Sequence, residues 1–124
     1  MLRTLGTMLL MVLLVACVAD SRPGSEACNA PSIELSLRLT ADTLTPSDPG
    51  VCRDQEVTLR IASEVDGLIH IHGYDHAIPA TEVVAGEELE LTFTADEDGQ
   101  YPIEFHPADD PEGVGVGILA VYDR

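Results

Sequence analysis

The stretch that decides the fold is residues 66–107, which read DGLIHIHGYDHAIPATEVVAGEELELTFTADEDGQYPIEFHP. Apolar residues alternate with polar ones over residues 89–93 and again over residues 101–105. Such alternation is typical of half-buried β-strands, because successive side chains point to opposite faces of a sheet. The dipeptides Asp66-Gly67 and Asp98-Gly99 are turn signals. The stretch therefore predicts β-strands separated by turns.

Similar strand signals occur on both sides of this stretch. Together the predicted strands cover residues 33–39, 57–61, 68–74, 81–84, 89–93, 101–105 and 115–122. Residues 40–54, which contain Pro46, Pro49 and Gly50, are interpreted as a long loop. No segment has a convincing helical pattern. About seven short strands with frequent turns predict an all-β fold, a small antiparallel β-sandwich or a Greek-key barrel.

The composition limits the classes of function. The chain has 124 residues, enough for one domain. Its 22 Asp and Glu residues against 6 Arg give a formal net charge of −16. This charge argues against nucleic acid and anionic lipid as partners, because both require a basic surface. The hydrophobic fraction of 45% excludes a disordered acidic tail.

The first twenty residues have the features of an export signal. Arg3 precedes an apolar run over residues 8–19, which is too short to span a bilayer as a helix. Residues 14–17, LVAC, resemble a bacterial lipobox, in which small residues precede a cysteine that becomes lipidated and N-terminal. The alternative is an ordinary signal peptide with a cysteine here by chance.

The lipobox resemblance implies a lipid anchor on Cys17 and a simple domain organisation. We expect a signal peptide over residues 1–16, the lipidated cysteine and a flexible tether over residues 17–30, and a folded domain over residues 31–124. The anchor alone would hold the protein on a cell membrane or outer membrane. The domain would then face the periplasm or the exterior.

Two further cysteines, Cys28 and Cys52, remain in the exported chain. In an oxidising compartment an even pair favours a disulfide. Closing a loop of this length would stabilise the fold by roughly 3–4 kcal/mol in the chain-entropy model. Two free thiols and a metal-binding pair are the alternatives.

The histidines are the main candidates for chemistry. His70 and His72 share one face of a predicted strand, and the isoleucines between and before them are better core residues. The alternation over residues 101–105 turns His106 outward too, so the three rings meet if the two strands are neighbours, and His76 follows in the next loop. Imidazoles suit Cu(II), Zn(II) and Ni(II), and the usual affinity order favours copper. The alternative is that these are solvated surface side chains.

Residues 66–121 resemble a cupredoxin-like domain, most closely that of periplasmic iron-uptake lipoproteins. The resemblance is carried by HIHGYD at 70–75, ELELTFTA at 88–95, DGQYPIEFH at 98–106 and the closing strand GVGILAV at 115–121, and residues 33–62 fit as the first two strands. It implies a Greek-key β-sandwich of about seven to eight strands. It also implies that any metal site lies at one end of the sandwich.

The chain departs from the blue-copper pattern of this family. His106 follows the strand YPIEF, where a blue-copper protein has its cysteine ligand. Residues 107–114, PADDPEGV, contain neither His nor Met, and all three methionines precede residue 12. A blue site needs a cysteine thiolate. A blue electron-transfer site and a dinuclear oxidase-type site are therefore excluded.

The resemblance leaves a cysteine-free metal site. Its ligands would be His70, His72 and His106, with His76, Glu104, Asp109 or Asp110 as additional ligands. We expect an exported protein that captures, stores or delivers copper, with zinc less favoured, and with a metal-transport or envelope protein as its partner. The alternative is a metal-free structural or interaction module. Three histidines can also activate water on zinc, but no nucleophile stands in a recognisable setting, and an enzyme is not expected.

Overall fold

The structure, a computed structural model, describes residues 22–124, so the expected signal peptide and lipidated Cys17 lie outside the described residues. The elements are α1 (Ser25–Asn29), β1 (Ser32–Leu39), β2 (Leu44–Thr45), β3 (Gly50–Cys52), β4 (Glu56–Ser63), β5 (Gly67–Ile71), β6 (Thr81–Val83), β7 (Glu88–Thr94), β8 (Gly99–Pro107) and β9 (Val114–Tyr122). Each predicted strand has a counterpart among them. Within residues 22–124, no helix is both long and apolar enough to cross a membrane.

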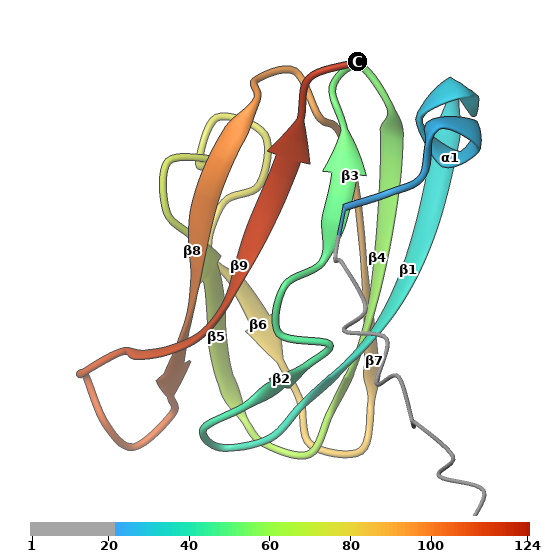
Figure 1. The fold of residues 1–124 in the computed structure, drawn as a ribbon. Coiled ribbons are helices and arrows are strands. Elements are labelled where there is room, and N and C mark those ends of the chain that lie inside the picture. The colour runs from blue at the N-terminus through green and yellow to red at the C-terminus, as the bar shows by residue number, and fades with distance from the viewer. Residues whose placement is uncertain (1–21) are drawn as a thin grey trace, which may run out of the picture.

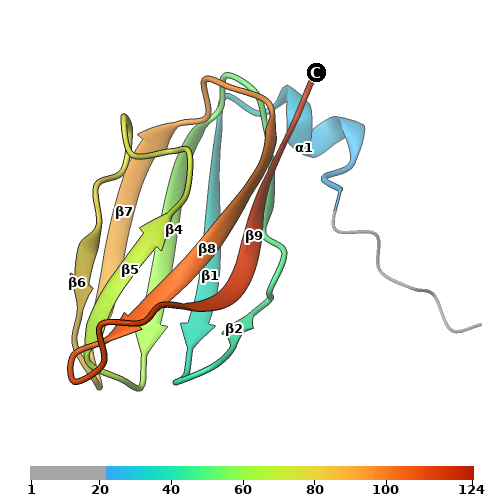
Figure 2. The same ribbon diagram turned by 90° about the vertical axis from the view of Figure 1, so that its left-hand side faces the viewer.

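The strands form two packed sheets (Figure 1). The back sheet has the order β2-β1-β4-β7, and the front sheet has the order β3-β9-β8-β5-β6. Figure 2 looks onto the front sheet, where β6, β5, β8 and β9 lie in succession. The prediction of an all-β sandwich is confirmed.

Two strand pairs are parallel, which differs from the antiparallel arrangement that the sequence predicts. β1 pairs with β4 in parallel from Ser32↔Glu56 to Leu39↔Ser63, and β3 pairs in parallel with β9. The predicted loop over residues 40–54 contains the short strands β2 and β3, one in each sheet. This segment returns the chain to the end of the sandwich where β1 began. An alternating pattern does not encode strand direction, so the sequence could not reveal this.

The two predicted turns carry the chain from one sheet to the other. Asp66-Gly67 leads from β4 of the back sheet into β5 of the front sheet, and Asp98-Gly99 leads from β7 into β8 in the same way. Gly67 is required by close packing. A Cβ atom there would lie 2.2 Å from the carbonyl oxygen of His106 and 2.7 Å from the ring of Phe105.

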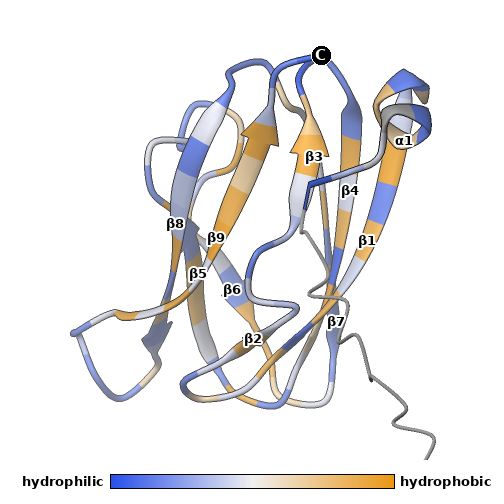
Figure 3. Cartoon of the chain, in the orientation of Figure 1, coloured by the Kyte–Doolittle hydropathy of each residue, from blue (hydrophilic) through white to orange (hydrophobic). Residues whose placement is uncertain are grey.

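The core fills the space between the sheets. Alternate residues of the long strands, such as Leu59, Ile103 and Leu119, are fully buried. The resulting apolar and polar bands along the strands are visible in Figure 3. Tyr74 closes one end of the core, with its ring edge-on to Phe93 at 5.6 Å between centroids. This packing fixes the loop that follows β5.

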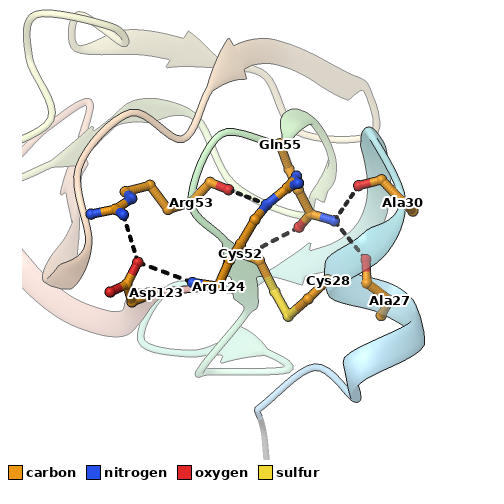
Figure 4. The surroundings of a disulfide bond; sticks show 8 residues. All are labelled: Ala27, Cys28, Ala30, Cys52, Arg53, Gln55, Asp123 and Arg124. Atoms are coloured by element: carbon orange, nitrogen blue, oxygen red, sulfur yellow. Dashed lines mark hydrogen bonds and ion pairs between the residues drawn. A yellow bond between two sulfur atoms is a disulfide. The ribbon is translucent and has the colours of Figure 1, made fainter.

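A disulfide joins Cys28 to Cys52, as the sequence predicts (Figure 4). It attaches α1 to β3, and Gln55 strengthens the junction through hydrogen bonds from its Nε2 to the carbonyl oxygens of Ala27 and Ala30. Residues 25–30, which the sequence places in the flexible tether, are therefore docked on the sandwich. No periodic signal in the sequence marks α1, because a helix of five residues is too short to show one.

Candidate metal site

Three histidines and a glutamate lie together on the outer face of the front sheet. β5 and β8 are antiparallel neighbours, and His70 lies directly opposite Glu104. Leu68 lies opposite His106, two residues further along the sheet. The intervening residues of both strands point into the core. The predicted neighbour relation of the two strands is therefore confirmed, and it places His70, His72 and His106 on one face.

The compact part of this cluster is formed by His70, Glu104 and His106. Each offers a ligand atom, and these atoms all lie within 4.8 Å of one another. Two atoms that each bind a metal at about 2.1 Å can be at most about 4.2 Å apart. The 3.5 Å between Oε2 of Glu104 and Nε2 of His106 already lies within this limit. All three side chains are half-buried on a solvent-facing sheet surface.

His72 extends the cluster on the side of Glu104. Its ring centroid lies 4.5 Å from that of His70, and its Nε2 lies 2.8 Å from Oε2 of Glu104. The same glutamate oxygen lies 3.5 Å from Nε2 of His106. The hydrogen-bonding contact with His72 lowers the pKa of Glu104. Glu104 is thus an ionised carboxylate between the imidazoles of His72 and His106. The sequence suggested it only as an additional ligand, whereas the structure places it within the cluster.

Asp75 fixes the orientation of His70, a role that the sequence did not reveal. Nε2 of His70 donates a hydrogen bond to Oδ1 of Asp75, and this bond lowers the pKa of Asp75. A carboxylate only accepts, so Nε2 carries the proton and Nδ1 of the neutral ring keeps its lone pair. A carboxylate behind a ligating histidine is a common feature of metal sites. The sequence feature that could have indicated this role is an aspartate five residues after His70, separated from it by the turn at Gly73.

His76 does not join the cluster. Its Nε2 lies 3.0 and 3.1 Å from the two carboxylate oxygens of Asp96, in the connection between β7 and β8. The hydrogen bond with Asp96 raises the pKa of His76, and the same bond lowers the pKa of Asp96. His76, which the sequence suggested as a further ligand, is therefore paired with Asp96 and lies outside the compact cluster. The loop carrying it is held by Tyr74, whose burial raises its own pKa to about 12.

Packing around His106 depends on Gly113 in the loop between β8 and β9. A Cβ atom at Gly113 would lie 2.6 to 3.1 Å from three atoms of the His106 ring. The absence of a side chain at Gly113 thus lets the loop cover the imidazole. Asp109 and Asp110, expected as additional ligands, lie elsewhere in this loop, where they line an open groove beside His106. Neither belongs to the compact cluster.

The position of the cluster differs from the end of the sandwich that the family resemblance implies. It lies on the face of the front sheet, because its side chains come from paired positions within β5 and β8. Neither described cysteine can contribute a thiolate, since Cys28 and Cys52 are bonded to each other. The donor set that the structure offers is therefore imidazole nitrogen and carboxylate oxygen.

In comparisons with known proteins, no protein-family model matches the chain, and no curated protein matches its sequence. Among solved structures, a copper binding protein determined in the apo form by NMR matches with a TM-score of 0.57 and 12% identity, over 74% of this chain and 89% of that one. The metal binding domain of the Cu(I) exporting P-type ATPase CopA of Streptococcus pneumoniae D39 matches with a TM-score of 0.53 and 14% identity. This match covers 73% of this chain and 86% of that domain's chain.

A multi-copper oxidase from Pediococcus acidilactici matches with a TM-score of 0.59 and 13% identity, over 83% of this chain but only 28% of the oxidase. Another multicopper oxidase, mgLAC, is covered over 39% of its length. The chain thus spans less than half of each of these enzymes. At such identities the likeness concerns the fold alone. The described domain is a β-sandwich of the cupredoxin-like class.

Proposed function

We propose that this protein binds a divalent transition metal, copper in the first place, through His70, Glu104 and His106, with His72 beside them. The proposal rests on one observation above all. Strand pairing brings ligand atoms of two imidazoles and an ionised carboxylate within 4.8 Å of one another on a half-buried surface. This revises the histidine-only site that the sequence suggests, because Glu104 lies at its centre.

Copper is favoured by the chemistry of the donor set. Imidazole and carboxylate ligands suit Cu(II), Ni(II) and Zn(II), and Cu(II) binds most tightly at equal availability. The solved structures of similar fold include proteins named as copper binding. A site without thiolate lacks the ligand of blue-copper electron transfer. We therefore propose capture, storage or delivery of copper rather than electron transfer or catalysis.

The proposal includes export and a lipid anchor. Its support is the apolar N-terminal run, the lipobox-like residues 14–17, and the Cys28–Cys52 disulfide, a bond that persists in oxidising compartments. The anchor would keep the acidic domain at a membrane without electrostatic attraction to anionic lipid.

The test is a Cu(II) titration of the full chain in detergent solution, by calorimetry with EPR of the product. A single site with nitrogen hyperfine structure is expected. Replacing His106 by Ala, or Glu104 by Gln, should weaken binding at least tenfold. His76→Ala is the matched control and should leave the affinity unchanged. Weak binding at many sites, equal in all four proteins, would contradict the proposal.

Copper affinity should also depend on pH. A ligating imidazole must be neutral, so binding should weaken as the pH falls below about 6.5. Titrations at several pH values between 5 and 8 would measure this. An affinity that stays constant over that range would argue against histidine ligands.

A metal-free interaction module is the second candidate function. The observation that favours it is that His70, His72 and His76 each already have a carboxylate partner, namely Asp75, Glu104 and Asp96. These pairs satisfy the rings without a metal. Under this reading, the copper titration shows only weak surface adsorption, and the His106→Ala and Glu104→Gln proteins match the unmodified chain.

A further inference from the structure

An open groove lies beside the candidate metal site, between the strands β5 and β6 and the loop from β8 to β9. Its apolar surface comes from Leu68, Val84, Pro107, Ala108 and Pro111. Leu68 and Val84 are two of the large hydrophobic side chains exposed on the described domain, at 44% and 38%. The loop from β8 to β9 projects from the sandwich and forms one wall (Figure 1). These two side chains leave apolar surface of the groove open to solvent, where a partner could cover it.

The polar part of the groove is acidic. Asp66, Glu82, Asp109 and Asp110 line it, and His106 is the one basic side chain among the lining residues. Glu82 lies directly opposite Leu68 in the β5–β6 pair, so a carboxylate flanks the apolar surface. Arg38, Arg53 and Arg60 pair with other carboxylates away from the groove. The groove therefore combines an apolar floor with a negative rim.

We propose that this groove binds a basic segment of a partner protein, one that presents a large apolar side chain between Lys or Arg residues. The charge selects this occupant. A second copy of the chain carries the same acidic rim and a net charge of −16, so two grooves repel each other. An anionic membrane is disfavoured for the same reason. A cationic segment gains attraction at the rim while its apolar side chain covers Leu68 and Val84.

His106 gives the groove its link to the candidate metal site. It lines the groove and also belongs to the cluster with His70 and Glu104. A segment in the groove would therefore contact the edge of that cluster. Docking itself does not depend on the proposed metal binding. Peptide docking is tested separately from metal binding, because a chelator keeps metal out of the docking assay.

The test is fluorescence anisotropy of dye-labelled hexapeptides with the full chain in nanodiscs of zwitterionic lipid, with EDTA present. The probe peptide is KLFKLK. The control peptides are ELFELE, which reverses the charge, and KGSKGK, which removes the apolar side chains. Saturable binding of KLFKLK alone is expected. Equal binding of KGSKGK would overturn the proposal, since it would show attraction by charge without use of the groove.

Variants locate the binding. The double change Leu68→Ser and Val84→Ser should weaken binding of KLFKLK about tenfold, because it removes the apolar contact. Ile118→Ser is the matched control, since Ile118 is equally exposed at 42% but does not line the groove. Equal losses in both proteins, or no loss in either, would overturn the proposal.

Other occupants have distinct signatures. In sedimentation experiments the chain should be monomeric. A dimer that is lost in the Leu68→Ser and Val84→Ser double variant would assign the groove to a second copy instead. Vesicles of phosphatidylglycerol should not bind through these two residues; if they did, the groove would be a lipid site. A failure of copper binding in the separate titration leaves the docking result intact.

Discussion

Gln55 is a single residue on which the N-terminal junction depends. Its side chain is fully buried, with Oε1 accepting a hydrogen bond from the backbone N–H of Cys52 at 2.8 Å. Its Nε2 donates to the carbonyl oxygens of Ala27 and Ala30 at 2.6 and 2.9 Å. One side chain thus satisfies three buried or half-buried backbone groups around the disulfide (Figure 4).

Replacing Gln55 by Leu should lower the free energy of unfolding by about 2–4 kcal/mol, because the backbone partners lose their bonds while the volume stays similar. Urea denaturation would measure the change. Gln100→Leu, at an exposed position of β8, is the matched control and should change stability by less than about 0.5 kcal/mol. Equal effects at both positions would show that the hydrogen bonds of Gln55 are not important.

Gly113 offers a second residue-level prediction. A methyl group at this position would meet the His106 ring, so Gly113→Ala should turn the ring away from Glu104 and His70. Copper affinity should fall while the fold is kept, because a surface ring can rotate at low cost. Gly115→Ala is the control, since a Cβ there meets nothing within 4 Å. Calorimetric titration of both proteins would compare them, and identical affinities would contradict the expectation.

At the scale of elements, the ion pair of His76 and Asp96 joins two loops. It connects the loop after β5 to the segment between β7 and β8. The backbone N–H of Glu97 also donates to the hydroxyl of Tyr74 at 3.3 Å. These contacts hold the loop that follows β5 against the segment between β7 and β8.

This pair should give the fold a defined pH dependence. The pKa of His76 is raised in the folded state, so its protonated form stabilises the fold. This contribution is complete below the ordinary histidine pKa of about 6.5 and is lost as the pH rises through the folded-state pKa. The pKa of Asp96 is lowered in the folded state, so its ionised form stabilises the fold. This contribution is complete above the ordinary aspartate pKa of about 3.9 and is lost as the pH falls through the folded-state pKa. The contribution is therefore greatest between about pH 4 and 6.5.

The measurement is the free energy of unfolding against pH, in the unmodified protein and in His76→Gln. The difference should be greatest near pH 5 and should shrink above neutrality. Both side chains are exposed, so the effect is small. The double variant His76→Gln and Asp96→Asn should follow the single variant, because the partner is already lost. A difference that does not change with pH would contradict the pairing.

For the whole molecule, the net charge of −16 is the dominant electrostatic feature. Like charges repel one another in the compact state, and this repulsion opposes folding. On the outer face of the back sheet, Arg60 relieves part of it by pairing with Glu34, Glu88 and Glu90. The hydrogen bond with Glu34, together with the negative charges, raises the pKa of the guanidinium further. Acidic residues outnumber Arg residues by 22 to 6, so such pairing offsets only part of the repulsion.

The melting temperature should therefore rise with ionic strength. Sodium chloride between 0.01 and 0.5 M shortens the Debye length from about 30 Å to a few ångströms, which screens long-range repulsion more than contacts at hydrogen-bonding distance. Calorimetric melting at a fixed pH of 7 would follow the change, with an uncharged osmolyte series as a separate control. A melting temperature that falls with salt would mean that the ion pairs outweigh the repulsion.

The sequence by itself determined the strands, because each is written as a local alternation of apolar and polar residues. It predicted all the long strands, the disulfide partners and the outward direction of His70, His72 and His106. It missed α1, β2 and β3, since these are short and are held by contacts with distant residues rather than by a pattern.

Only the tertiary structure decided which strands are neighbours and in which direction they run. The parallel pairing of β1 with β4 depends on how residues 40–54 cross the sandwich, and no alternation encodes such a path. The same holds for the candidate site. Strand register placed Glu104 beside the histidines, and the contact of two connecting segments paired His76 with Asp96. Local sequence specifies the face that a side chain takes, but not its distance from residues of other elements.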